Sequence, residues 1–214
     1  MAADADFEDL IAFQTSGLSI ESEQLQGGPI TNISIEAQDT LISAQTAYNL
    51  NFTPASSISS STEAKITIEF PGTLDFESNR CSILSRSSSF SNSMSCNLSG
   101  NTVTLSYIFA NRPDFVGGTP LSVTISELTN PGYVSDIGAF IFKTFIKVNS
   151  QYYLQDQMTT NTNLVQFDPG FITKTSEVTS SSYQASKQDA IYVFEMEMQN
   201  PVPINGRIRI NVPT

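Results

Sequence analysis

Apolar and polar residues alternate with a period of two along most of this chain. The clearest cases are the stretches 65–70, 102–107 and 121–126, in which every second residue is apolar and the residues between are Lys, Glu, Ser or Thr. Successive side chains of a strand point to opposite faces, so this pattern predicts half-buried β-strands. The run 140–147 is more continuously apolar and predicts the central strand of a sheet.

Turn-forming residues separate the predicted strands at short intervals. Gly, Pro, Asn or Asp cluster at 71–72, 100–101, 117–120, 130–132 and 168–170. Strands with turns at this spacing indicate an all-β protein with an Ig-like antiparallel β-sandwich. One further stretch, 6–13, has an apolar spacing that suits a short helical turn.

Two distant parts of the chain match each other. The segments 48–52 and 65–71 return as 192–196 and 207–213, with Tyr48 and Tyr192 separated by 144 positions (192 − 48). Gly28-Pro29-Ile30-Thr31 likewise matches Gly170-Phe171-Ile172-Thr173 at a separation of 142 (170 − 28). A self-match with so long a period is typical of tandem repeats.

The self-match predicts three segments. We expect 28–168 to be a complete Ig-like repeat, 1–27 to be a linker or the tail of a preceding repeat, and 169–214 to open the next repeat. On this hypothesis the chain belongs to a longer array, and strands over 192–212 lack sheet partners. That segment should be poorly packed or should contact another chain or a neighbouring unit.

The chain is acidic, with 21 acidic against 10 basic residues and a net charge of −11. This balance argues against nucleic acid as a partner and does not suit an anionic membrane, because both require clustered Lys and Arg. No apolar run approaches the roughly 20 residues of a membrane span. The stretch 1–9 is acidic and lacks the features of a signal peptide, so either the chain is cytosolic or Met1 is not the native start. We prefer the second interpretation.

Two cysteines, Cys81 and Cys96, flank a Ser-rich stretch. A disulfide between them would close a loop of about 15 residues and contribute about 3 kcal/mol; the alternative is two reduced, partly buried thiols. Glycosylation sequons begin at Asn32, Asn51 and Asn97, and the alternation of apolar neighbours points Asn32 and Asn51 outward. Together these features favour an extracellular or cell-surface location.

Several motifs occur in a fixed order along the chain. They are Tyr-x-Leu-x-Phe at 48–52, Lys-Ile-Thr-Ile-Glu-Phe-Pro at 65–71, the cysteine pair, Val-Thr-Leu at 103–105, Leu-Ser-Val-Thr-Ile-Ser-Glu-Leu-Thr-Asn-Pro at 121–131 and Phe-Ile-Phe at 140–142. This order resembles the tandem Ig-like repeats of very large secreted or surface proteins of protists and, more distantly, those of bacterial adhesin stalks. The resemblance covers 28–168 and the start of the next copy. It implies a structural or adhesive role without catalytic residues, and it supports a Cys81–Cys96 disulfide.

The residues for most enzymatic chemistry are missing. The chain has no histidine, which removes Ser-His-Asp and Cys-His nucleophiles and the commonest zinc ligand. Gly117-Gly118 lacks the Lys-Ser/Thr of a phosphate-binding loop and is interpreted as a turn. Asp75 and Glu77 could act as paired carboxylates only within a cleft, and a solvated loop is the alternative. We therefore expect no enzyme activity.

Calcium is the one inorganic ligand that the residue types suit, because it binds to oxygen ligands. The candidate positions are Asp75 and Glu77, Asp168 at the expected junction, and the N-terminal residues Asp4, Asp6, Glu8 and Asp9. None has the EF-hand spacing, and a charge that only confers solubility is the alternative. No other cofactor is expected.

Aromatic residues at alternating positions are assigned to the core: Tyr48, Phe52, Phe70, Tyr107, Phe140 and Phe142. Tyr152-Tyr153 places one ring on the surface, where it could form a contact. The leading hypothesis is a non-enzymatic structural or adhesive repeat that works by spacing and display, with other repeats or neighbouring chains as partners. The alternative is a carbohydrate- or peptide-binding module that uses loops such as 111–120 or the edge strands; an enzyme is a third hypothesis that would require a deep pocket.

Overall fold

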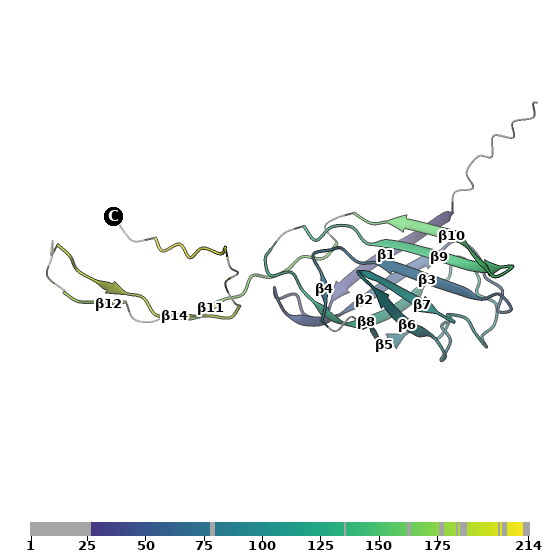
Figure 1. The fold of residues 1–214 in the computed structure, drawn as a ribbon, viewed down its shortest axis with the longest axis horizontal. Helices are drawn as coiled ribbons and strands as arrows, with labels where there is room; N and C mark the ends of the chain where they lie inside the picture. Colours follow the sequence, from purple (N-terminus) through teal and green to yellow (C-terminus); the bar gives the residue numbers. More distant parts are fainter. Residues whose placement is uncertain are drawn as a thin grey trace, which may run out of the picture.

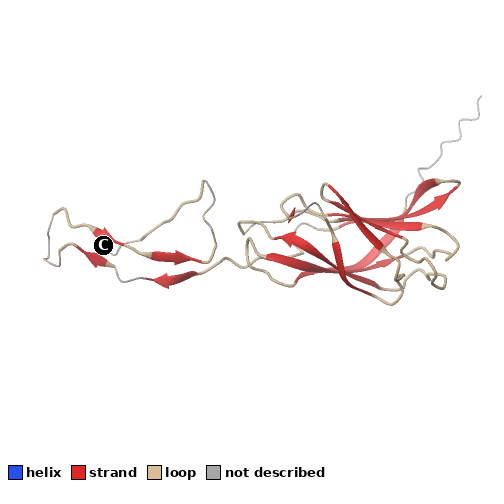
Figure 2. Ribbon diagram, turned by 60° about the horizontal axis from the view of Figure 1, so that its bottom comes forward, coloured by secondary structure: helices blue, strands red, loops and turns tan. Residues whose placement is uncertain are grey.

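The structure is a computed structural model that describes residues 27–77, 80–134, 136–161, 164–175, 178–182, 184, 188–200, 202 and 205–211. These residues form β-strands and loops (Figure 2). Ten strands belong to the main body: β1 (Gly28–Ala37), β2 (Gln45–Pro54), β3 (Ala64–Glu69), β4 (Asp75–Phe76), β5 (Ser82–Arg86), β6 (Ser95–Ser99), β7 (Thr102–Ser106), β8 (Leu121–Thr129), β9 (Ile141–Val148) and β10 (Gln151–Thr159). The expectation for 6–13 lies outside the described residues.

The ten strands form one curled, mixed sheet that folds over into two layers (Figure 1). Its order is β4-β8-β2-β1-β10-β9-β3-β7-β6, with β5 also paired to β8. Strand β1 joins the layers: Gly28 and Pro29 pair in parallel with β10, whereas the rest of β1 pairs antiparallel with β2. The result is a half-barrel that resembles Ig-like β-sandwiches, and we refer to this two-layered body as the sandwich.

The apolar residues of the alternating pattern form the inner face of this sandwich. In β3, Ile66 and Ile68 are buried while Lys65, Thr67 and Glu69 are only half-buried on the outer face. The expected central strand is confirmed as β9, which pairs with β3 on one side and β10 on the other. Aromatic rings fill the middle of the core, in the pairs Phe70–Phe140 at 5.3 Å, Phe70–Phe76 at 5.2 Å and Phe52–Phe142 at 5.2 Å between ring centroids.

Tyr107 was predicted to join the core, and this prediction was wrong. Val103 and Leu105 of the same alternation are buried, but the side chain of Tyr107 is 55% exposed. Strand β7 ends at Ser106, and Tyr107 adopts a φ of 56°, in the left-handed region. That backbone conformation breaks the period-two rule and turns the ring outward.

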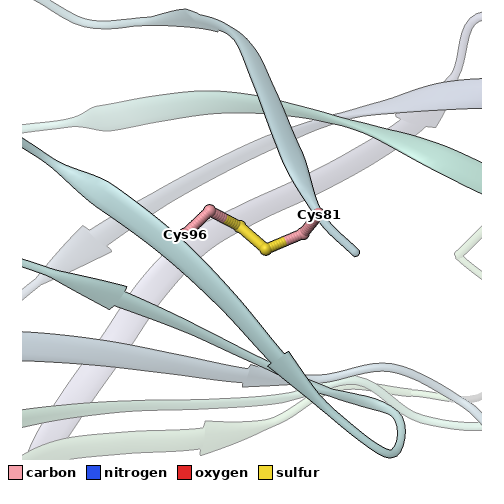
Figure 3. The surroundings of a disulfide bond; sticks show 2 residues. All are labelled: Cys81 and Cys96. Atoms are coloured by element: carbon pink, nitrogen blue, oxygen red, sulfur yellow. A yellow bond between two sulfur atoms is a disulfide. The ribbon is translucent and has the colours of Figure 1, made fainter. Parts of the chain in front are cut away.

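A disulfide closes the sandwich on the side away from β1. Cys81 immediately precedes β5, at the edge of the β2–β8 layer, and Cys96 lies in β6, at the edge of the other layer (Figure 3). Their Cα atoms are 5.9 Å apart. Between them, Phe90 and Met94 fold inward and are buried. The predicted pairing of the two cysteines is therefore confirmed.

The C-terminal part forms a separate ribbon (Figure 1). Its strands are β11 (Ile172–Thr175), β12 (Thr179–Ser180), β13 (Tyr192–Val193) and β14 (Met196–Met198), with β11 paired to β14 and β12 to β13. Residues 207–211, which match β3 in sequence, form no strand. A strand needs a neighbour for its backbone groups, and the described residues offer none there.

Part of the ribbon repeats the register of the β1–β2 hairpin. The match holds for β11 and β14, whereas Tyr192 pairs with Ser180, one residue beyond Thr179, the counterpart of the Ala37 that pairs with Tyr48. Ile30 pairs with Pro54 in the sandwich, and Ile172 pairs with Met198 in the ribbon. The offsets are 142 (172 − 30) and 144 (198 − 54), which are the separations of the two sequence matches. The burial differs: Ile30 and Tyr48 are buried, whereas Ile172 is 53% and Tyr192 59% exposed.

Candidate functional site

The loops that gather around the start of β1 form one end of the sandwich, which we call the loop end: residues 55–63, 87–94, 107–120 and 149–150. Hydrogen bonds tie these loops together. The backbone groups of Ile58 and Phe115 pair, and the backbone N–H of Ser60 donates to Asp114 Oδ1 at 2.8 Å. The rings of Phe90, Phe109 and Phe115 stack beneath them, at 6.0 and 4.7 Å between centroids, and give the loops an apolar floor.

A hollow of about 430 Å³ opens at the loop end, within the region 111–120 that the sequence singled out. Its lining includes Ser89, Arg112, Asp114, Val116 and Thr119. Arg112 Nε donates to the Phe90 carbonyl at 3.0 Å, which holds the guanidinium against the loop. Hydrogen bonds from the backbone and side chain of Ser60 lower the pKa of Asp114, so this carboxylate stays ionised.

A second hollow, of about 260 Å³, lies beside a row of polar side chains. We call Tyr107, Glu63, Lys147 and Tyr152 the polar row; these residues lie at or beyond the ends of β7, β3, β9 and β10. Lys147 Nζ is 2.8 Å from Glu63 Oε2, and the Tyr152 hydroxyl donates to Glu63 Oε1. One carboxylate thus anchors groups from two other strands.

The residues of the polar row shift one another's pKa values. Hydrogen bonds from Lys147 and then Tyr152 lower the pKa of Glu63, and the bond to Glu63 raises the pKa of Lys147. The hydrogen bond to Glu63 likewise raises the pKa of Tyr152. Lys65 Nζ lies 3.9 Å from the centre of the Tyr152 ring and covers one of its faces. At neutral pH the row is therefore a fixed pattern of donors, acceptors and rings.

The opposite end of the sandwich, which we call the junction, holds the segment that leads to the ribbon. Asp168 makes two backbone hydrogen bonds: its N–H donates to the Thr40 carbonyl at 2.8 Å, and its carbonyl accepts from Ile42 at 3.1 Å. Its carboxylate accepts from Thr40 Oγ1 at 2.5 Å. These contacts fix the point at which the chain leaves the sandwich.

The calcium candidates do not converge. Asp75 is an exposed residue of β4, Glu77 accepts from Gln45 Nε2, and Asp168 is engaged by Thr40 at the junction. Within the described residues, no three His, Cys, Asp or Glu side chains form a group that could hold a metal ion. The acidic residues between Asp4 and Asp9 lie outside the described residues. Calcium binding stays a prediction.

The three sequon asparagines differ in their surroundings. Asn32, in β1, and Asn97, in the edge strand β6, are exposed. Asn51 is half-buried in β2, between its partners Ser34 of β1 and Ser122 of β8. A glycan has open space at Asn32 and Asn97, whereas Asn51 lies in the middle of a sheet.

Sequence reasoning pointed to the loop 111–120 and to Tyr152-Tyr153, but it missed Glu63 and Lys147 and misplaced Tyr107. Glu63 and Lys147 are 84 residues apart, and register alone brings them together: Ala64 pairs with Ile146. No motif marks such a pair in the sequence. The strained φ of Tyr107 has no clear signal either, because Tyr is not a typical residue for the left-handed region.

Two observations bear on location. The disulfide is typical of proteins in oxidising, extracellular compartments. The described part of the chain contains no helix with the length and hydropathy needed to cross a membrane.

Comparison with solved structures finds distant similarity to β-rich extracellular domains. A bacterial hydrophobin, BslA, is 13% identical over 66% of this chain and 98% of its own, with a TM-score of 0.33. The N-terminal domain of the Streptococcus gordonii adhesin Sgo0707 is 13% identical over 60% of this chain and 31% of its own, with a TM-score of 0.29. The human F-spondin reeler domain is 14% identical over 67% of this chain and 93% of its own, with a TM-score of 0.26. No protein-family model and no curated protein matches the chain.

Proposed function

We propose that this chain is a non-enzymatic structural or adhesive module of an extracellular or cell-surface protein, and that it acts by spacing and display. The observation that carries the proposal is the register that the β11–β14 pair shares with the β1–β2 hairpin. On this proposal the ribbon is the opening hairpin of a second unit. Its exposed apolar residues, which include Ile172 and Tyr192, would then be buried in the core of that unit when its other strands are present.

The geometry of the sandwich supports a role in spacing. Strand β1 begins at the loop end, whereas Asp168 and the ribbon lie at the junction, at the opposite end of the sandwich (Figure 1). When the polypeptide enters a unit at one end and leaves it at the other, each unit adds its full length to the array. The Cys81–Cys96 disulfide and the pairing of β1 with both layers hold the two layers together on both sides of the sandwich.

A segment exchange tests the proposal. In the full chain, residues 28–54 are replaced by a copy of 170–198, so that Tyr192 takes the place of Tyr48. If the two hairpins are equivalent, the chimera unfolds cooperatively in urea with an m-value like that of the parent chain. The matched control carries the same 29 residues in scrambled order and should not fold cooperatively. A chimera that behaves like the scrambled control would overturn the tandem-unit proposal.

The second candidate function is a carbohydrate- or peptide-binding module on the same sandwich. The observation that favours it is the exposed aromatic ring of Tyr107 beside a hollow at the loop end. Binding residues commonly lie on loops that a rigid scaffold positions. The two candidates are compatible, because a module that separates its neighbours along the chain can also carry a binding site on its loops.

A further inference from the structure

We propose that the 260 Å³ hollow and the polar row bind a neutral glycan, with one sugar ring stacked on Tyr107. This proposal rests on the second candidate function and assigns its site and ligand class. The floor of the hollow is apolar, formed by Ala64, Ile108 and Phe109, and its wall carries the hydroxyl-bearing residues Ser60, Ser61 and Thr62. A sugar ring has the matching character, with an apolar C–H face and hydroxyl groups around its edge.

The platform for that ring is Tyr107. Its side chain is among the most exposed aromatic groups in the described part of the chain, yet its backbone is held at a φ of 56°. A bulky residue in the left-handed region costs free energy, so the surroundings must impose the conformation. Such strained residues cluster at ligand-binding sites. Here the strain presents a flat ring at the rim of the hollow.

The polar row offers both donors and acceptors for hydroxyl groups. Glu63 is held by Lys147 at 2.8 Å and by the Tyr152 hydroxyl, and the side chains of Glu63 and Lys147 are 39% and 34% exposed. The carboxylate keeps lone pairs for ligand hydroxyls, and the ammonium keeps N–H groups to donate. A hydroxyl is both donor and acceptor, so it can bridge the two.

Charge and backbone pairing select the ligand class. Lys147 and Lys65 balance the carboxylates of Glu63 and the neighbouring Asp114, and the chain carries a net charge of −11, which disfavours an anionic glycan. Strands β3 and β9 below Glu63 and Lys147 are paired on both sides and offer no free edge for an extended peptide. Strand β10 pairs with β1 only at Asp156 and Gln157, but the hollow and Tyr107 lie on the other side of β3, next to β7. A neutral, hydroxyl-rich ligand with an apolar face remains the best match.

The test is a titration of the ¹⁵N-labelled full chain with cellotriose, maltotriose, chitotriose and lactose, and with an alginate trisaccharide as the acidic comparison. We expect at least one neutral sugar to shift the amide signals of 60–64 and 107–110 saturably, and the acidic sugar to bind more weakly. Tyr107→Asn removes the ring but keeps a residue that tolerates the left-handed region, and it should weaken binding about tenfold. Tyr107→Phe should keep the affinity within about twofold.

The matched control is Tyr133→Asn, because Tyr133 is 57% exposed, lies outside the loop end and is absent from the hollow. It should bind as the parent chain does. Glu63→Gln preserves shape and should weaken binding several-fold, which gives a second readout if Tyr107→Asn folds poorly. The proposal is overturned if no neutral sugar shifts these amides, if the acidic sugar binds more tightly, or if Tyr107→Asn binds normally. Shifts confined to 112–119 would overturn this site while leaving a binding module in the larger hollow.

Discussion

The hydroxyl of Tyr48 donates a hydrogen bond of 2.6 Å to Asn130 Oδ1 inside the sandwich. The amide nitrogen of Asn130 in turn donates to the carbonyls of Asp39 and Leu41, at 2.8 Å each. Those residues flank Thr40, which binds Asp168 at the junction. A buried tyrosine of the first hairpin is thus connected, through one amide, to the point where the ribbon begins.

This connection predicts that Tyr48→Phe destabilises the protein. The change keeps the ring but leaves Asn130 Oδ1 without its donor in a buried site, which should lower the free energy of unfolding by about 1–3 kcal/mol. Urea denaturation provides the measurement. Tyr133→Phe, at an exposed site, serves as the control and should change the value by less than about 0.5 kcal/mol. Equal effects for the two variants would contradict the role of the buried hydrogen bond.

Tyr48 should also make stability depend on alkaline pH. Burial raises the pKa of Tyr48, so the folded state keeps the proton where the unfolded chain loses it. The stabilisation is complete below the unfolded value of about 10 and is lost as the pH rises above it. The free energy of unfolding should then fall with a slope of up to about 1.4 kcal/mol per pH unit. The difference between the curves of the parent and Tyr48→Phe isolates this contribution, and parallel curves would contradict it.

Removing the disulfide should weaken the sandwich without abolishing it. The bond closes a loop across 15 positions, and the chain-entropy model assigns such a loop about 3 kcal/mol. The double variant Cys81→Ala/Cys96→Ala should lose about that much free energy of unfolding in urea. The parent chain measured with a reductant is the control and should match the double variant. A loss below about 1 kcal/mol would show that the other contacts already hold the two layers together.

The ion pair of the polar row predicts a titration shift. Lys147 is the largest cause of the lowered pKa of Glu63. In Lys147→Gln the pKa of Glu63 should rise toward its ordinary value, which carboxyl-detected NMR measures directly. Because the folded pKa is depressed, the associated stabilisation is present above the unfolded value of about 4.3 and is lost as the pH falls. An unchanged titration would show that Lys147 does not act on Glu63 in solution.

A side chain at Gly117 should destabilise the protein. A Cβ at this position would overlap the carbonyl of Ala55, and backbone cannot move aside as a flexible side chain can. Gly117→Ala should therefore cost about 1–3 kcal/mol of unfolding free energy. Gly72→Ala is the matched control, since nothing lies within 4 Å of its Cβ. Similar stability of the two variants would contradict the close approach of the two loops.

The strands were predictable because burial on one face imposes a period of two. Ile66, Ile68 and Phe70 show this rule, and all three are buried as expected. Tyr107 follows the same period in sequence yet points outward, because the strand ends one residue earlier. The pairing of Cys81 with Cys96 was also expected, since two cysteines on one short excursion have few alternatives.

The sequence alone determined the all-β class, the core faces of β3, β7 and β8, the acidic composition and the match between two segments, because each depends on the order of neighbouring residues. Tertiary structure decided that β1 joins both layers, that Glu63 meets Lys147 and Tyr152, and that Asp168 binds Thr40. These contacts link residues far apart in the chain, and they depend on strand register and loop geometry. A local pattern specifies which face a side chain takes, but only the assembled sheet specifies which distant side chain it meets.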